Sequence, residues 1–286
     1  MVRLNESILK KSGRTKLAVF TDLDGSLLDH DTYSFENARP ALERIREQKV
    51  PLIFTTSKTR PEIEVLQATM GIREPFIVEN GAAVFFPDGY RRWRIDAGFH
   101  QSPYRVIQLG ASYRQIRRFV QALQPAFRIQ GFGDLGIADI VRLTGLSPAQ
   151  AVLAKQRDFT EPFFLDDDSR VVDLEAIAEA CELKVTRGGR FYHLMGAGQD
   201  KGLAVKQAVS VFHRHAGPGL LTIGLGDSAN DRAMLESVDI GILIPHPDGS
   251  YEDLSMPNLR RARHPGSRGW NDMVLKLLET HAGRAS

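Results

Sequence analysis

The stretch FTDLDGSLLD, residues 20–29, decides the fold of this chain of 286 residues. It continues the apolar run KLAVF (16–20), whose composition predicts a buried β-strand. Asp22 and Asp24 stand one residue apart at the predicted end of that strand, the edge at which open α/β sheets bind ligands. A buried carboxylate is costly unless an opposite charge or a hydrogen bond compensates it. The pair therefore predicts a cation or a polar ligand at this edge.

A second pair of acids follows a second apolar run. GLLTIGLGD (219–227) is predicted to be another strand, and GDSAND (226–231) places Asp227 and Asp231 just behind it. Because parallel strands end at the same edge of a sheet, we expect four carboxylates to converge there. Such a group repels itself unless a cation lies between its members. Ligands that are all oxygen favour a hard ion, and we expect Mg²⁺.

Two common nucleotide and metal motifs do not fit these residues. An EF-hand loop needs its glycine at the sixth position after a helix, whereas Gly25 is at the fourth position and follows a strand. No GxxxxGK[ST] sequence occurs, so a P-loop is excluded. Taken alone, Asp22 and Asp24 favour a capped turn over a catalytic pair, and GDSAND alone is compatible with a turn followed by a helix cap. Only the combination of motifs along the chain separates these interpretations.

Composition excludes several classes of protein. With 37 basic and 35 acidic residues the net charge is +2, which argues against a nucleic-acid partner bound through bulk charge. The single cysteine, Cys181, excludes an intrachain disulfide, and we interpret it as a buried helical thiol. We expect no membrane partner, because no apolar stretch approaches the ~20 residues of a span and the N-terminus lacks a signal-peptide core. These features predict a cytoplasmic protein, and they leave its oligomeric state open.

Short apolar runs alternate with helical patterns, which predicts an α/β fold, a Rossmann-like parallel sheet. Residues 1–15 form an N-terminal extension in this interpretation, and residues 16–85 and 198–286 form the catalytic core. The segment 86–197 differs in pattern and is predicted to be an inserted α+β domain. Within 82–95 the sequence predicts a hairpin that turns at Pro87–Asp88–Gly89.

The order of the polar motifs resembles the haloacid dehalogenase (HAD) superfamily. The stretch from Asp22 to Asp24 is similar to its first motif, and Thr56 in IFTTSKTR is similar to its second. Lys201 in QDKGLAV resembles the third motif, and GDSAND (226–231) resembles the fourth. The resemblance implies a HAD core with an inserted cap domain that determines substrate specificity.

The resemblance also implies a role for each acid. Asp22 is the nucleophile that forms an aspartyl-phosphate, and Asp24 is the general acid and base. The implied Mg²⁺ ligands are Asp22, Asp24 through its main-chain carbonyl, and Asp227, supported from behind by Asn230 and Asp231.

Two further core residues are implied to contact the phosphate. Thr56 donates a hydrogen bond to a phosphoryl oxygen, and Lys201 balances its charge. Both are therefore counted with Asp22 and Asp24 as catalytic residues.

Within the superfamily, four stretches resemble the mannosyl-3-phosphoglycerate phosphatase family: 143–163, 186–196, 55–62 and 76–85. The resemblance covers about residues 16–245. It implies a small anionic sugar-phosphate substrate, 2-O-mannosyl-3-phosphoglycerate, which is hydrolysed to phosphate and mannosylglycerate, a compatible solute.

Basic residues of the predicted cap suit such a substrate. Arg187 and Arg190 flank a glycine turn beginning at Gly188, where the backbone can approach a ligand closely, and arginine forks suit carboxylates. Arg157 and Glu161 are four residues apart at a predicted helix end, where they either bind the sugar or form an exposed ion pair. The predicted substrate-binding residues are Ser57, Arg157, Glu161, Arg187, Gly188 and Arg190.

Other functions remain open on the same core. The substrate could be glucosyl-3-phosphoglycerate or sucrose phosphate, because epimers differ only in the position of one hydroxyl. A phosphomutase would return the phosphate rather than release it. A non-catalytic sensor predicts loss of at least one key residue, yet all four are present: Asp22, Asp24, Lys201 and Asp227.

Overall fold

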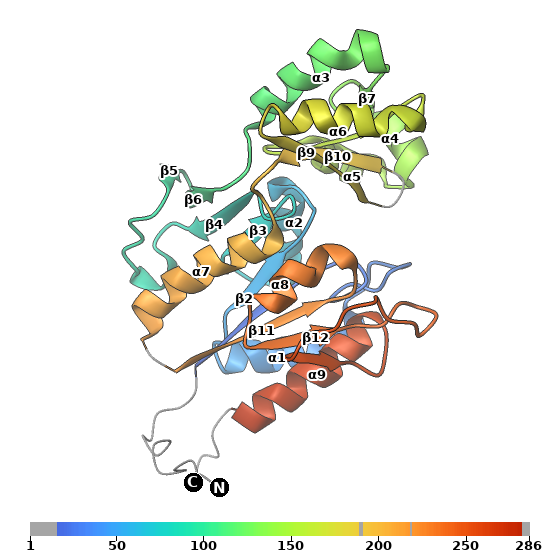
Figure 1. The fold of residues 1–286 in the computed structure, drawn as a ribbon. Coiled ribbons are helices and arrows are strands. Elements are labelled where there is room, and N and C mark those ends of the chain that lie inside the picture. Colours follow the sequence, from blue (N-terminus) through green and yellow to red (C-terminus); the bar gives the residue numbers. More distant parts are fainter. Residues whose placement is uncertain (1–15, 189–190, 218, 282–286) are drawn as a thin grey trace, which may run out of the picture.

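Two sheets of different size organise the chain. The computed structural model describes residues 16–188, 191–217 and 219–281, so the predicted N-terminal extension 1–15 lies outside the described residues. Figure 1 shows a lower lobe built on a nine-stranded sheet and an upper lobe built on a four-stranded sheet. Among the described residues, none of the helices has the length and apolar character needed to cross a membrane.

Six parallel strands, from the edge strand β13 to β3, form most of the large sheet. They run in the order β13-β12-β11-β1-β2-β3. Their bounds are β1 Lys16–Thr21, β2 Leu52–Thr55, β3 Phe76–Val78, β11 Leu220–Gly226, β12 Ile240–Leu243 and β13 Leu259–Arg261. Along β1, Val19 packs into one core cluster and Phe20 into the other, because successive side chains point to opposite faces. The predicted α/β parallel sheet is confirmed.

Helices cover both faces of this sheet. One face carries α1 Arg39–Glu47, α2 Arg60–Met70 and α9 Gly266–His281, and the other carries α7 Lys201–Ala216 and α8 Arg232–Glu236. Thr59 begins α2 as part of a capping box with Glu62, and Gly71 ends it in the left-handed conformation. This capping box fixes the end of the loop that follows β2.

Three antiparallel strands extend the large sheet beyond β3: β4 Ala83–Pro87, β6 Tyr104–Gln108 and β5 Phe99–Gln101. The predicted hairpin at 87–89 is wrong, since β4 pairs with β3 and β6. After Gly89 the chain forms a short 3-10 turn, and Tyr90 and Trp93 pack on Phe212 of α7 instead of forming a strand. Strands β5 and β6 lie within the predicted insertion 86–197 but pair in the large sheet, and the division into domains stays a prediction.

The small sheet is antiparallel, in the order β7-β8-β10-β9. Its strands are β7 Gln130–Gly131, β8 Glu161–Phe164, β9 Leu183–Gly188 and β10 Phe191–Gly196, and its helices are α3 Tyr113–Phe127, α4 Ile137–Thr144, α5 Pro148–Lys155 and α6 Val171–Glu179. Ile116 of α3 and Leu174 of α6 share one apolar cluster with this sheet. β9 pairs antiparallel with β10, the strand that follows it along the chain.

Two expectations in this lobe are corrected. Arg157 and Glu161 are not neighbours on a helix, because α5 ends at Lys155 and Glu161 begins β8. Cys181 is exposed rather than buried. It lies beyond the last residue of α6, whereas Leu174 and Ala178, four residues apart, carry the buried face of that helix.

Candidate active site

Three carboxylates and one ammonium group meet where β1 and β11 end. The Nζ atom of Lys201 lies 2.6 Å from Oδ1 of Asp22 and 2.6 Å from Oδ1 of Asp231. A carboxylate oxygen each from Asp22, Asp227 and Asp231 lies within 4.8 Å of the others. All four side chains are buried, Lys201 with only 1% of its surface exposed. Strand ends predicted the convergence of Asp22, Asp227 and Asp231, while Lys201 was expected here from the family resemblance. The side chain of Asp24, the fourth predicted carboxylate, pairs with Lys58 instead of joining this cluster.

The backbone around Asp22 explains why a glycine follows. The Asp22 amide donates to the carbonyl of Leu225 on β11, which extends the β1 pairing by one residue. Gly25 then adopts a φ of +77°, and a Cβ atom there would lie 2.3 Å from Oδ2 of Asp227. Only glycine combines this conformation with the close approach. The turn thus brings the first motif against the fourth.

Asp231 faces both the backbone and Lys201. Its Oδ2 accepts hydrogen bonds from the amides of Asp227 (3.0 Å) and Ser228 (3.2 Å), while Oδ1 accepts from Lys201. This geometry holds the loop after β11 in place and agrees with a supporting role. Asn230, predicted to share that role, is exposed and only accepts a hydrogen bond from the Ser228 hydroxyl. The structure therefore leaves Asn230 outside the acid cluster.

Burial and mutual repulsion dominate the electrostatics here. Burial raises the pKa of Asp22 well above its usual value; Lys201 opposes this, and the neighbouring carboxylates add to it. Burial and the charge of Asp231 raise the pKa of Asp227 to about 6. Burial alone would lower the pKa of Lys201, but Asp22 and Asp231 outweigh it and raise the pKa, so the ammonium stays charged.

The donor set fits a divalent metal ion. Three carboxylates and one ammonium leave a formal charge of −2, which a divalent cation balances. The ligand atoms are all oxygens, as hard cations prefer, and they lie close enough to bind one ion. The missing Cβ of Gly25 lets the Asp227 carboxylate lie close against the first motif. This supports a metal-binding site, the coarser form of the predicted Mg²⁺ site.

Asp24 pairs with a lysine that the sequence analysis did not single out. Nζ of Lys58 lies 2.8 Å from Oδ2 of Asp24, while Oδ1 of Asp24 is buried and has no hydrogen-bond partner among the residues described. Burial lowers the pKa of Lys58, but Asp24 and Glu62 outweigh it and raise the pKa. The only sequence signal was the position of Lys58 two residues after Thr56.

Thr56 follows β2 directly and is buried. Its amide donates to the carbonyl of Ile77, its carbonyl accepts from the Asn80 amide, and its Oγ1 accepts from the Lys58 amide at 3.2 Å. The loop is thus fixed at the same sheet edge as the acid cluster. The predicted catalytic roles of Thr56, Asp22, Asp24 and Lys201 nevertheless stay predictions.

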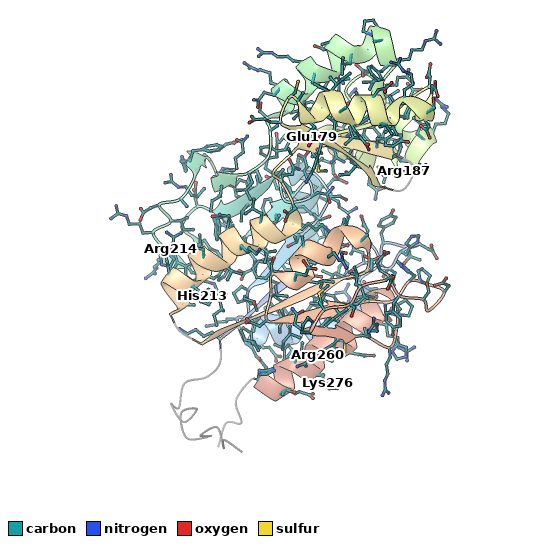
Figure 2. All side chains as sticks on the ribbon, viewed as in Figure 1. Glu179, Arg187, His213, Arg214, Arg260 and Lys276 are labelled. Atoms are coloured by element: carbon teal, nitrogen blue, oxygen red, sulfur yellow. The ribbon has the colours of Figure 1, made fainter. Side chains whose placement is uncertain are left out.

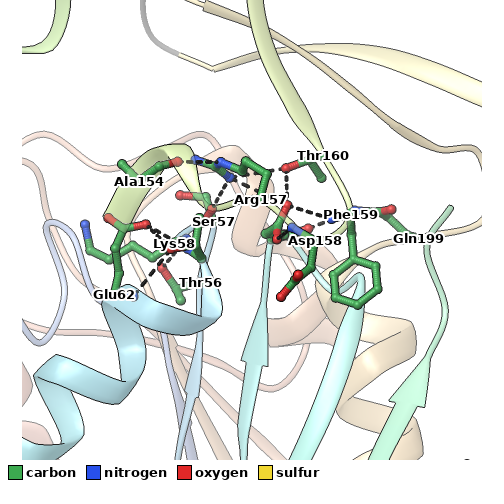
Figure 3. Close-up of polar contacts among 12 residues, drawn as sticks. Thr56, Ser57, Lys58, Glu62, Ala154, Arg157, Asp158, Phe159, Thr160 and Gln199 are labelled. Carbon is green, nitrogen blue, oxygen red and sulfur yellow. Dashed lines mark hydrogen bonds and ion pairs between the residues drawn. The ribbon is translucent and has the colours of Figure 1, made fainter. Parts of the chain in front are cut away.

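The predicted substrate-binding residues are spread over two places. Arg157 lies against the core, where Nη1 donates to the Ser57 carbonyl at 3.0 Å (Figure 3). Arg187 is exposed on β9, 5.5 Å from the centre of the Tyr192 ring, and Figure 2 shows it at the lower rim of the upper lobe. Gly188 ends β9. Arg190 lies outside the described residues.

Glu161 is buried within the small lobe. Its Oε1 accepts from the amide of Gly133 at 2.7 Å and from Nη1 of Arg117 at 3.2 Å. Burial raises the pKa of Glu161, although the Tyr113 hydroxyl, Gly133 and Arg117 act in the opposite direction. The sequence missed Arg117, because nothing in its helical context distinguishes it from a surface arginine.

Comparison with known proteins identifies the family. A family model of haloacid dehalogenase-like hydrolases matches residues 19–96. The glucosyl-3-phosphoglycerate/mannosyl-3-phosphoglycerate phosphatase of Persephonella marina is 52% identical over 262 residues, which is 92% of this chain and 97% of that protein. This chain belongs to the mannosyl-3-phosphoglycerate phosphatase family. The protein of the same name from Methanococcoides burtonii is 41% identical over 270 residues, again 92% and 97% of the two chains.

Solved structures support the same fold. A HAD-superfamily phosphatase from Bacteroides thetaiotaomicron superposes with a TM-score of 0.63 at 14% identity, covering 97% of this chain and 99% of that one. A sucrose-phosphatase from Synechocystis, solved with sucrose and phosphate, gives 0.57 at 16% identity, with 94% and 98% covered. The predicted HAD fold and the predicted class of activity, hydrolysis of phosphoric monoesters, are confirmed.

Proposed function

We propose that the chain hydrolyses mannosyl-3-phosphoglycerate and glucosyl-3-phosphoglycerate to phosphate and the free glycosylglycerate, with Mg²⁺ as its metal. The observation that carries this proposal is the buried cluster of Asp22, Lys201, Asp227 and Asp231, in a chain 52% identical to a phosphatase named for both substrates. We propose the cytoplasm as its compartment, since a compatible solute acts there.

Asp22 attacks phosphorus. Lys201 holds its Oδ1 at 2.6 Å, which leaves Oδ2 as the attacking atom. The bond between phosphorus and the ester oxygen breaks as the aspartyl-phosphate forms, so one difficult displacement becomes two easier ones. The ammonium of Lys201 also balances charge on the phosphoryl oxygens, and the Thr56 hydroxyl donates to one of them.

Asp24 moves the protons. Its Oδ1 has no hydrogen-bond partner in the described part of the chain, so this oxygen can carry the proton that the departing glycerate alkoxide takes up. In the second half Asp24 removes a proton from water, which attacks phosphorus and restores the Asp22 carboxylate. Lys58 fixes the side chain through Oδ2 at 2.8 Å, so the other oxygen keeps one orientation.

Asp22, Asp227 and the main-chain carbonyl of Asp24 would hold the metal. A bound Mg²⁺ supplies positive charge that lets an anionic carboxylate approach an anionic phosphate. Asp231 keeps Asp227 in place through the backbone amides that it binds.

Residues of the cap, together with Ser57 of the core, would contact the glycosylglycerate part. Ser57 and Arg157 lie beside Thr56, while Arg187 and Gly188 lie on the β9 side of the cap. We propose that this set, with Glu161 and Arg190, binds the substrate carboxylate and the sugar hydroxyls, since arginine forks suit the first and a buried carboxylate the second.

The test is phosphate release from mannosyl-, glucosyl- and unglycosylated 3-phosphoglycerate, with and without Mg²⁺. Release from the two glycosylated compounds that requires both Mg²⁺ and Asp22, with Asp22→Asn as control, supports the proposal. Release from the mannosyl compound alone would restrict the proposed substrate to mannosyl-3-phosphoglycerate. Release from none of the three would refute the proposed substrate, and recovery of the phosphate on another position of the same molecule would reveal a mutase.

A further inference from the structure

A buried glutamate of the large sheet binds a segment of the small lobe. Glu79 follows β3 and has none of its surface exposed. Its Oε1 accepts from the Asp158 amide at 2.8 Å, and its Oε2 accepts from the Phe159 amide at 3.2 Å and from the Thr160 hydroxyl at 2.6 Å. All three donors come from the connection between α5 and β8, which we call the docking segment, 157–160.

The docking segment also contacts the loop after β2. Arg157 donates to the Ser57 carbonyl at 3.0 Å and to the Thr160 hydroxyl oxygen at 3.2 Å, and its guanidinium lies 3.9 Å from Oε2 of Glu79 (Figure 3). Beside it, Nε of Arg60 lies 3.3 Å from Oδ2 of Asp158. The segment is therefore held on the core at the residues next to Thr56.

A second contact reaches the connection that returns from the small lobe. Nε2 of Gln199 donates to the Glu79 carbonyl at 2.8 Å, and Oε1 of Gln199 accepts from the Gly196 amide at 3.1 Å. Gln199 is fully buried. Glu79 thus contacts the docking segment with its side chain and the returning connection with its backbone.

The backbone conformation of Glu79 is one that a glutamate rarely adopts. Its φ is +48°, in the left-handed region that glycine and asparagine adopt at much lower cost than glutamate. A residue held in such a conformation points to a function for its side chain. Here the side chain supplies the acceptors for three donors of the other lobe.

We propose that Glu79 is a positioning residue that docks the cap on the core through segment 157–160, and so completes the site for the glycosylglycerate part of the substrate. The expected effect on catalysis rests on the proposed function, whereas the docking of the cap on the core does not. If the cap moved away from the core, the buried Glu79 carboxylate would lose its three hydrogen-bond donors. The docked arrangement is therefore favoured. A substrate that spans core and cap depends on docking, whereas a small phosphate ester bound by the core alone does not.

Hydrogen exchange tests the docking directly. In Glu79→Gln, and in the milder Thr160→Val, the amides of Asp158 and Phe159 should exchange at least about 10-fold faster than in the wild-type protein, while amides of β1 remain unchanged. Glu182→Gln is the matched control, since Glu182 is also at positive φ (+57°) but is exposed. Unchanged exchange at 158 and 159 in both folded variants would overturn the proposal, whatever the substrate is.

Kinetic measurements then test the effect of docking on catalysis. With mannosyl-3-phosphoglycerate, kcat/KM of both variants should fall at least about 10-fold, while kcat/KM with p-nitrophenyl phosphate stays within about 2-fold of wild type. A folding defect, or a disturbed Thr56 loop, would lower both values together and would overturn the positioning role. If the wild-type protein does not hydrolyse the glycosylated compound, the proposed function fails, and the exchange result still decides the docking.

Discussion

Replacing Lys201 by methionine removes the ammonium group that lies between Asp22 and Asp231. Methionine has nearly the same length and no charge, so the change leaves two buried carboxylates without the group that lies 2.6 Å from each. Removing one partner of a buried ion pair costs about 3–5 kcal/mol of folding free energy. Loss of the charge that faces the phosphate should lower kcat at least about 100-fold.

The loss of stability should depend on pH. Burial already raises the folded pKa of the Asp22 carboxyl above its unfolded value of about 3.9, and loss of the Lys201 charge raises it further. Between these two pKa values the folded state holds more protons than the unfolded state, so stability falls as pH rises. The full cost of Lys201→Met should therefore appear near pH 8 and shrink near pH 5, where one carboxyl is neutral.

Urea unfolding at pH 5 and pH 8, in the presence of a chelator, measures both effects. Lys276→Met is the control, because Lys276 is exposed on α9 (Figure 2), and it should change the unfolding free energy by less than about 0.5 kcal/mol. A cost for Lys201→Met below about 1 kcal/mol at pH 8, or an equal cost at both pH values, would refute the reasoning about this cluster.

Three further changes test neighbouring groups. Gly25→Ala places a Cβ within 2.3 Å of Oδ2 of Asp227 at a φ of +77°, so titration calorimetry should show weaker Mg²⁺ binding and thermal unfolding should show a loss of about 1–3 kcal/mol in folding stability. An unchanged Mg²⁺ affinity would contradict the packing argument. Because burial and Asp231 raise the pKa of Asp227 to about 6, calorimetry should show that the Mg²⁺ affinity falls about 10-fold per pH unit below pH 6 and is constant above it. Equal affinity at pH 5 and pH 7 would contradict the role of Asp227 as a metal ligand. Lys58→Met should lower kcat about 10-fold but change the unfolding free energy by less than about 1 kcal/mol, since the ion pair of Lys58 with Asp24 is partly exposed. A variant with the wild-type kcat would exclude a role for Lys58 in orienting Asp24.

The sequence predicted the acid cluster because the information is local to strand ends. Asp22 and Asp227 each follow an apolar run, and parallel strands bring such positions to one edge. Thr56 was singled out by its resemblance to the second motif of the superfamily. Asn230 was grouped with Asp231 by its place in a motif, but backbone geometry turns it to the surface.

Long-range pairs were beyond sequence reasoning. Lys58 meets Asp24, and Glu79 meets residues about 80 positions away, through contacts that only the tertiary fold creates. The predicted hairpin at 87–89 failed for a related reason: aromatic packing of Tyr90 and Trp93 on α7 outweighed the local turn signal. The assumed helical pair of Arg157 and Glu161 failed because the docking segment leaves the helix after Lys155 to reach Glu79.

The central claim is that Asp22 carries the phosphoryl group during turnover. The direct measurement is rapid acid quench of the wild-type protein with mannosyl-3-phosphoglycerate and Mg²⁺, followed by mass spectrometry of the peptide that contains Asp22. We predict a phosphorylated Asp22 that forms before phosphate is released and accumulates further in Asp24→Asn, where its hydrolysis lacks a base. Phosphate release at full rate with no phosphoryl group on Asp22 at any time would contradict the account.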